Sequence, residues 1–244
     1  MTPDLVTTDL VATDPVATDP VTPVQALARL TALEDPAKAA EAAAYHKAER
    51  RYLGLPNPVI DLLVADWRAA LTVEDRVALA AALWQSDIHE ARIAAAKLLT
   101  QARLRPDAAA WALICQWVPQ FDAWAIADHV CIAAQKRLTA DPARIDEVAG
   151  WTTSPLMWTR RAALVATLPF TKQNHPKPHE TAIRDRVLGW CALYADDRDW
   201  FIQKSVAWWL RDLSRHDAPR TTAFLAEHGH RLKKFARIEA AKHL

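Results

Sequence analysis

The chain contains two copies of one nine-residue segment, ARIAAAKLL at residues 91–99 and ARIEAAKHL at residues 236–244. The two copies are identical at seven of their nine positions. Each places one basic side chain before a run of small and aliphatic residues, a composition with high helix propensity. Shorter versions of this basic-then-small pattern occur at residues 160–164 and 203–207. The marker bases of the four segments are Arg92, Arg161, Lys204 and Arg237.

The spacing of the marker bases defines a repeat. Successive markers are 69, 43 and 33 residues apart, and the first interval is close to two units. A unit of roughly 35–45 residues is typical of HEAT-type repeats, in which each unit is a pair of helices. Stacked pairs form a curved solenoid whose concave face is lined by the second helix of each pair. We therefore predict an all-α, HEAT-like helical-repeat solenoid.

Composition and local signals agree with this fold. The chain has 51% apolar residues but only four glycines, which suits packed helices better than strands and their turns. Asp and Pro residues typical of helix starts are found at Pro36, Asp75, Asp107, Asp122, Asp141–Pro142 and Asp217. Helix breaks are predicted at residues 54–58, 105–106, 150, 171–178 and 229.

The first 23 residues have a different composition. The pentapeptide ATDPV at residues 12–16 is repeated immediately at residues 17–21. Prolines at such short intervals block helix formation, and little in this stretch can form a core. We predict a disordered, low-complexity tail over residues 1–23 with no catalytic role, followed by one repeat domain over residues 24–244.

Charge and cysteine usage restrict the function only weakly. Residues 1–44 carry seven acidic and two basic side chains, so the remaining chain has 28 bases and 22 acids. A moderately basic body suits a polyanionic partner, although ordinary soluble domains reach the same value. The three cysteines form no Cys-x-x-Cys pair, and no apolar run reaches membrane-spanning length. We expect a cytoplasmic monomer with reduced thiols and no membrane association.

Trp124 and Asp128 form the first candidate site. They are four residues apart, so on a helix they lie on the same face. A carboxylate beside an indole ring can stabilise a developing positive charge. The alternative interpretation is a core tryptophan with a solvated aspartate near it.

Two further segments place cations beside tryptophans. Arg161 follows Trp158 by three residues and could hold a phosphate with its planar guanidinium, or it could be a repeat arginine paired with an acid of the next helix. Lys204, Trp208 and Arg211 share a helix face. Trp209 points elsewhere, and since adjacent tryptophans cannot both be core on one amphipathic helix, one of the two is expected to serve another surface.

Motifs for metal or nucleotide chemistry are incomplete. His89-Glu90 begins like a zinc-protease helix, but Ile93 stands where the second histidine would be needed. His175 and His179 flank a Pro-rich loop without metal-ligand spacing, and the sequence has no Gly-rich phosphate loop. We therefore predict neither a metal site nor a cofactor.

Taken in order, these segments resemble the AlkD-like DNA alkylation repair proteins, which are alkylpurine DNA glycosylases built from HEAT-like repeats. The resemblance extends from about Tyr45 to the C-terminus. It is carried by the blocks YLGL (52–55), LWQS (83–86), HEAR (89–92), FDAW (121–124), WTRR (158–161), FIQK (201–204) and WWLR (208–211). Pro155 and the Trp208-Trp209 pair depart from the family pattern without removing a functional group.

The resemblance implies a site on the concave, DNA-binding face. Trp124 and Trp208 match the two indoles of the family's cleft. Asp128 matches the catalytic carboxylate, and Arg161 matches the arginine that contacts the DNA backbone. Tyr45 resembles a further aromatic residue of the cleft. The family's cleft is flat and grips the lesion through the backbone, with no deep base pocket.

The implied activity is hydrolysis of the N-glycosidic bond of cationic purines, N3-methyladenine and N7-methylguanine, in base excision repair. The implied partner is double-stranded DNA containing alkylated purines, with Lys204 and Arg211 as further DNA-binding residues and no cofactor. Two alternatives remain open at this point: a non-catalytic HEAT-like DNA-binding protein, and a solenoid that binds other proteins.

Overall fold

The computed structural model describes residues 21–244, so the predicted tail lies almost wholly outside the described residues. The last residues assigned to the tail instead begin the first helix. The Thr22 hydroxyl accepts a hydrogen bond from the Gln25 backbone N–H at 3.2 Å, and the Gln25 side chain accepts one from the Thr22 N–H at 2.8 Å. This reciprocal capping box starts helix α1 at Pro23.

The described chain is all-α, which confirms the predicted fold class. Residues 21–244 form thirteen α-helices and contain no named strand. The α-helices are α1 (Pro23–Thr31), α2 (Pro36–His46), α3 (Asn57–Ala70), α4 (Val73–Gln85), α5 (His89–Leu98), α6 (Ala108–Trp117), α7 (Trp124–Ala140), α8 (Ile145–Trp151), α9 (Met157–Ala166), α10 (Pro178–Leu193), α11 (Trp200–Ser214), α12 (Ala218–His228) and α13 (Lys234–Ala240). Short 3₁₀ helices are η1 (Val118–Gln120), η2 (Pro142–Arg144), η3 (Leu168–Thr171) and η4 (Gly229–Arg231).

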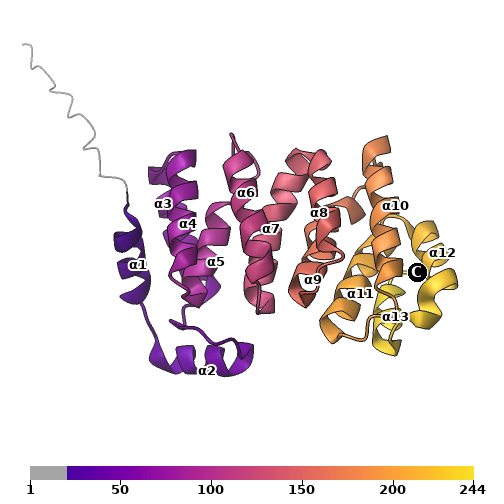
Figure 1. Cartoon of the computed structure of the whole chain (residues 1–244), viewed down its shortest axis with the longest axis horizontal. Helices are drawn as coiled ribbons and strands as arrows, with labels where there is room; N and C mark the ends of the chain where they lie inside the picture. Colours follow the sequence, from indigo (N-terminus) through magenta and orange to yellow (C-terminus); the bar gives the residue numbers. More distant parts are fainter. Residues whose placement is uncertain (1–20) are drawn as a thin grey trace, which may run out of the picture.

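The helices stack as pairs, in agreement with the predicted repeat (Figure 1). The second helices α5, α7, α9, α11 and α13 pack against one another in succession. The marker bases Arg92, Arg161, Lys204 and Arg237 lie on four of these helices. The sequence repeat is therefore a repeat of the second helix of each pair.

Most of the predicted helix boundaries agree with the structure. Asp217 caps α12, and Asp75 lies in the first turn of α4. Asp122 behaves differently, because its carboxylate pairs with Arg50 and α7 begins at Trp124 without a side-chain cap. The predicted break at Gly150 agrees with the end of α8, which follows one residue later at Trp151.

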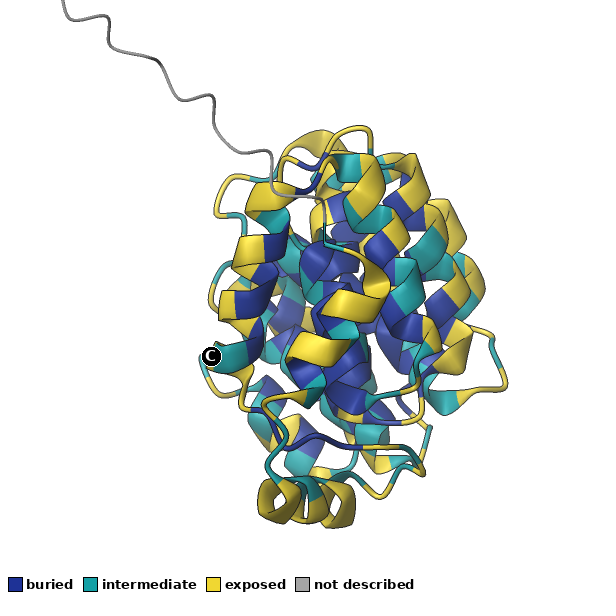
Figure 2. Ribbon diagram, turned by 90° about the vertical axis from the view of Figure 1, so that its left-hand side faces the viewer, coloured by how far each residue is buried: buried dark blue, intermediate teal, exposed yellow. Residues whose placement is uncertain are grey.

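The interior between the layers is apolar and closely packed (Figure 2). Trp84 stacks on Trp117 with ring centroids 4.4 Å apart and planes 7° from parallel. The buried polar side chains serve the turns between helices. Gln203, which is fully buried, donates to three backbone carbonyls of the turn before α11, those of Tyr194, Ala195 and Asp197. These bonds satisfy carbonyls that the helix ends leave unpaired and fix the start of α11.

Helix α2 lies across the ends of the helices at the N-terminal side of the stack, and none of its residues is buried (Figure 1). Its anchor is the segment around Gly54, which has a φ of +75° that favours glycine. A Cβ at this position would lie 2.5 Å from the Ala39 backbone nitrogen, so only glycine permits this close approach. The Glu90 carboxylate, in the first turn of α5, holds the segment by accepting hydrogen bonds from the N–H groups of Leu53 and Gly54, both at 2.8 Å.

Candidate active site

A cleft of about 660 Å³ runs over the ends of α2, α7, α9 and α11. It brings together six of the seven predicted site residues and leaves out Arg211. The residues that line it are Tyr45, His46, Lys47, Asp122, Ala123, Trp124, Asp128, Trp158, Arg161, Trp200, Phe201, Lys204 and Trp208.

Asp128 and Arg161 form a two-pronged ion pair across α7 and α9. Arg161 Nη2 lies 3.3 Å from Asp128 Oδ2, and Nη1 donates a shorter bond to Oδ1. The Arg161 side chain is only 5% exposed, whereas Asp128 is 23% exposed. Trp158 covers the guanidinium, whose central carbon is 5.6 Å from the ring centroid. Arg161 thus fixes the orientation of a carboxylate that remains accessible from the cleft.

The same pair also follows the register of the repeat. Partners in the Arg161–Asp128 pair are 33 positions apart, and other ion pairs join neighbouring units at similar separations. Lys97 pairs with Asp61 36 positions away, and Arg160 pairs with Asp197 37 positions away. The structural interpretation of Arg161 as a repeat arginine therefore describes the contact correctly. The pair differs from those others because both of its members line the cleft.

The aromatic side chains offer flat, accessible surfaces in the cleft. Trp124 is 37% exposed, and Tyr45 meets it edge-on with ring centroids 6.1 Å apart. Trp208 is half-buried on the cleft wall, whereas the adjacent Trp209 is fully buried in the core. The prediction that the two neighbouring tryptophans serve different surfaces is confirmed.

Lys204 and Arg211 are both held by Glu239 of α13. Lys204 Nζ lies 2.7 Å from Glu239 Oε2, and Arg211 Nη1 lies 2.6 Å from Glu239 Oε1. Glu239 is one of the two positions at which the second nonapeptide departs from the first, where Ala94 occupies the equivalent place. This acid draws Arg211 toward the last helix, so Arg211 does not line the cleft with Lys204.

Sequence reasoning did not identify an aromatic row at the C-terminal side of the cleft. Phe201 lies 4.6 Å from Trp158 and 5.0 Å from Trp200, measured between ring centroids. Trp200 is exposed and stacks on Phe235 at 5.9 Å. The available signal was the Trp200-Phe201 dipeptide directly after the cap residue Asp199, because it places two aromatic side chains in the first turn of α11, and this turn borders the cleft.

Two further observations concern other classes of site. No group of three or more His, Cys, Asp or Glu side chains in residues 21–244 is arranged to hold a metal ion. Within the same residues, no helix combines the length and the apolarity needed to cross a bilayer.

The thiol of Cys115 lies outside the cleft. Burial raises the pKa of Cys115 to about 12 and, with the nearby Glu147 carboxylate, keeps this thiol protonated.

Departures from the family pattern leave this geometry intact. Pro155 lies two residues before the first residue of α9 and does not interrupt the helix. Its carbonyl accepts a hydrogen bond from the Arg160 side chain at 3.1 Å. Arg161, one position further, retains its place opposite Asp128.

Comparison with known proteins places the chain in a family. The family model described as DNA alkylation repair enzyme matches residues 26–244. A structure described as a predicted DNA alkylation repair enzyme from Enterococcus faecalis is 21% identical, with a TM-score of 0.73 over 86% of this chain and 96% of that chain. AlkD2 from Streptococcus mutans is 18% identical, with a TM-score of 0.57 over 77% of this chain and 88% of that chain.

No curated protein matches the sequence. The two structural likenesses establish a shared helical-repeat fold, and the family model extends from helix α1 to the last residue. The chain therefore belongs to the DNA alkylation repair enzyme family.

Proposed function

We propose that the protein is a DNA glycosylase that hydrolyses the N-glycosidic bond of cationic alkylated purines, N3-methyladenine and N7-methylguanine, in double-stranded DNA. The observation that supports this best is the position of Asp128, whose oriented and accessible carboxylate shares one cleft with Trp124 and Trp208. Indole faces can stabilise a cationic base, and a carboxylate can stabilise the positive charge that develops on the sugar.

The chemistry follows from the charge of the lesion. Alkylation at N3 of adenine or N7 of guanine makes the base cationic and a good leaving group. Each indole face attracts a cation by about 0.5–2 kcal/mol, and more when water is excluded. Departure of the base leaves an oxocarbenium-like sugar, as in the hydrolysis of glycosides. The reaction uses water alone and needs no redox or metal cofactor.

Asp128 is proposed to stabilise the sugar cation and to position the attacking water. Arg161 acts through Asp128, because its two Nη groups hold the carboxylate and its side chain is almost completely covered. The Nε–H of Arg161 has no hydrogen-bond partner, but the side chain is only 5% exposed, which limits its contact with a phosphate. We therefore assign Arg161 mainly to positioning, with DNA-backbone contact as a secondary role.

The DNA backbone is proposed to lie along the rim of the cleft. Lys47 is exposed at the end of α2, and Lys204, which pairs with Glu239, lines the cleft from α11. Two cations from different helices of the cleft suit contact with the phosphates of a duplex. We expect residues 24–244 to act as one unit, as a monomer in the cytoplasm.

The decisive experiment is an assay of base release from methylated duplex DNA, with a uracil-containing duplex as the matched control. Release of methylpurines but not of uracil supports the proposal. A binding-only protein is the second candidate, because the Arg161–Asp128 pair also fits the repeat register. That candidate predicts salt-dependent DNA binding without base release.

A further inference from the structure

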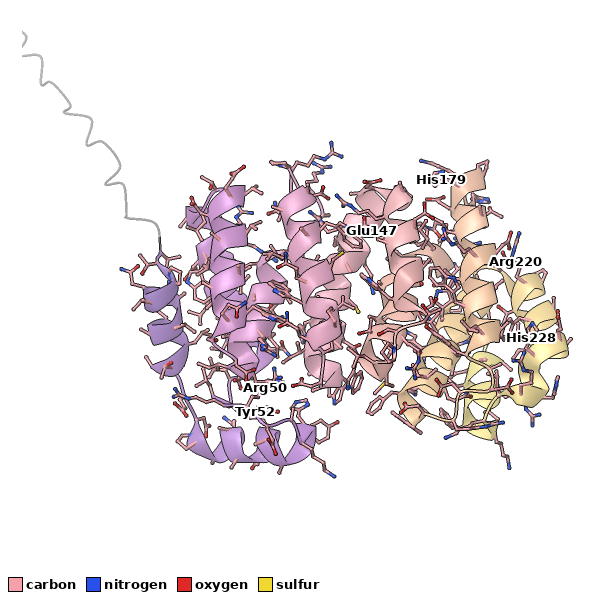
Figure 3. The ribbon with its side chains drawn as sticks, viewed as in Figure 1. Arg50, Tyr52, Glu147, His179, Arg220 and His228 are labelled. Atoms are coloured by element: carbon pink, nitrogen blue, oxygen red, sulfur yellow. The ribbon has the colours of Figure 1, made fainter. Side chains whose placement is uncertain are left out.

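A second chamber of about 430 Å³ lies beside the cleft, between α2 and the first turns of α3, α5 and α7. Three side chains, Tyr45, His46 and Trp124, line both the cleft and the chamber, so they form the wall between the two. The inner side of the chamber carries His89 from α5 and His129 from α7. Figure 3 shows this region through the labelled Arg50 and Tyr52, which lie between α2 and the ends of the upright helices.

The chamber wall is a continuous set of aromatic rings. The centroid of the His46 ring lies 5.3 Å from Trp124 and 4.7 Å from His89. His89 in turn stacks on Tyr52 at 4.7 Å. Rings at these separations form flat apolar surfaces on which another planar ring can stack.

Two hydrogen-bonding groups in this wall are unused. Among the described residues, the buried Nδ1 atoms of His46 and His89 have no hydrogen-bond partner, and His89 is only 4% exposed. The third histidine differs, because His129 Nδ1 lies 2.7 Å from the Ala125 carbonyl and Nε2 lies 3.1 Å from Asn57 Oδ1. These two Nδ1 atoms are covered by protein, so a ligand in the chamber cannot reach them and must contact the histidines through Nε2 or the ring face.

The imidazoles are neutral groups at ordinary pH. Burial, helped by the nearby His46 and Arg50, lowers the pKa of His89 to about 3, and burial also lowers the pKa of His46. A neutral imidazole can offer its nitrogen as donor or as acceptor according to its tautomer. The chamber therefore suits a planar, hydrogen-bonding and uncharged heterocycle better than a phosphate. The Glu90 carboxylate is already engaged with the backbone of Leu53 and Gly54.

We propose that this chamber binds the purine base released from the DNA, stacked on the wall that Tyr45, His46 and Trp124 form and hydrogen-bonded to the Nε2 atoms of His46 and His89. The proposal rests on the proposed glycosylase function and adds a product site that the family resemblance does not imply. A base that leaves the sugar beside Trp124 reaches the chamber by passing the ring that the two spaces share.

The test measures binding of free 3-methyladenine to the full-length protein without DNA, by calorimetry or by saturation-transfer NMR. The parent protein should bind the base. His46→Leu and His89→Leu should each weaken binding by about two- to tenfold, the effect of one lost hydrogen bond to a neutral group. His179→Leu is the matched control, because this histidine is exposed at the start of α10, far from the chamber (Figure 3), and its loss should leave binding unchanged.

Melting curves for each variant show whether it is folded. If His89→Leu does not fold, His46→Leu carries the test, because His46 is half-buried at the end of α2. No binding by the parent, or parental binding by the folded chamber variants, overturns the proposal. Base release from methylated DNA by the same preparations tests the glycosylase function separately, because free-base binding does not depend on catalysis.

Discussion

Replacing Asp128 by Asn tests the role of the carboxylate most sharply, because the change keeps the size of the side chain and removes its charge. If Asp128 faces the developing sugar cation, excision of N7-methylguanine should fall by about two to three powers of ten, the scale seen when one preorganised electrostatic group is lost. DNA binding should be at least as strong as in the parent, because an acid has been removed from a surface that faces phosphates.

The structure adds an effect on stability. Asn can still accept one hydrogen bond from Arg161, but the ion pair is lost and the guanidinium, 5% exposed, has no ionised partner. Breaking a buried pair costs about 3–5 kcal/mol, and the 23% exposure of Asp128 places this pair below that range. We expect a loss of about 1–3 kcal/mol in the free energy of unfolding.

A matched control separates stability from catalysis. Asp197 pairs with Arg160 at 3.1 Å, is also 23% exposed, and does not line the cleft. Asp197→Asn should lower the melting temperature by less, because Arg160 is 22% exposed, and should leave excision by the folded protein unchanged. The assay is single-turnover release of N7-methylguanine with a melting curve for each variant. If folded Asp128→Asn excises at the parental rate, the reasoning is refuted and the binding-only function is favoured.

Three further outcomes are expected. The enzyme should release N7-methylguanine and N3-methyladenine but not uracil, because indole faces favour a cation and neutral uracil is a poor leaving group; efficient uracil release would contradict this. Glu239→Gln should raise DNA affinity and steepen its dependence on salt by about one ion, because Lys204 in the cleft loses its ionic partner; an unchanged salt slope in a binding titration would count against it. Deleting residues 1–20 should leave the melting temperature and excision unchanged, whereas a decrease in either would assign the tail a role. The deletion ends at residue 20 because Thr22 caps α1, and such a cap contributes about 1 kcal/mol to stability.

The repeat fold could be predicted because the relevant signal is local. Marker bases and small residues recur along the chain. Each recurrence falls on the second helix of a pair, and these second helices pack against one another. Helix boundaries were less predictable where a side chain has a distant partner. Asp122 carries the residue type of a cap, but its carboxylate pairs with Arg50, which is 72 positions away in the chain.

For the candidate site too, contacts within one helix were predictable and contacts between distant helices were not. The four-residue spacing of Trp124 and Asp128 places both in one cleft, as expected from a single helix. Arg211 shares a helix face with Lys204, yet Glu239 holds it away from the cleft, and this contact depends on how α13 packs. The chamber under α2 was not predictable, because it depends on the backbone approach at Gly54.

The central claim is that Asp128 and its neighbouring indoles act in the removal of a cationic purine. The most direct measurement is the release of N7-methylguanine from methylated duplex DNA by the purified parent protein, in single turnover and with heat-released base as the standard. The account predicts base release well above the spontaneous rate. Tight, salt-sensitive binding of the same duplex with release only at the spontaneous rate would contradict it.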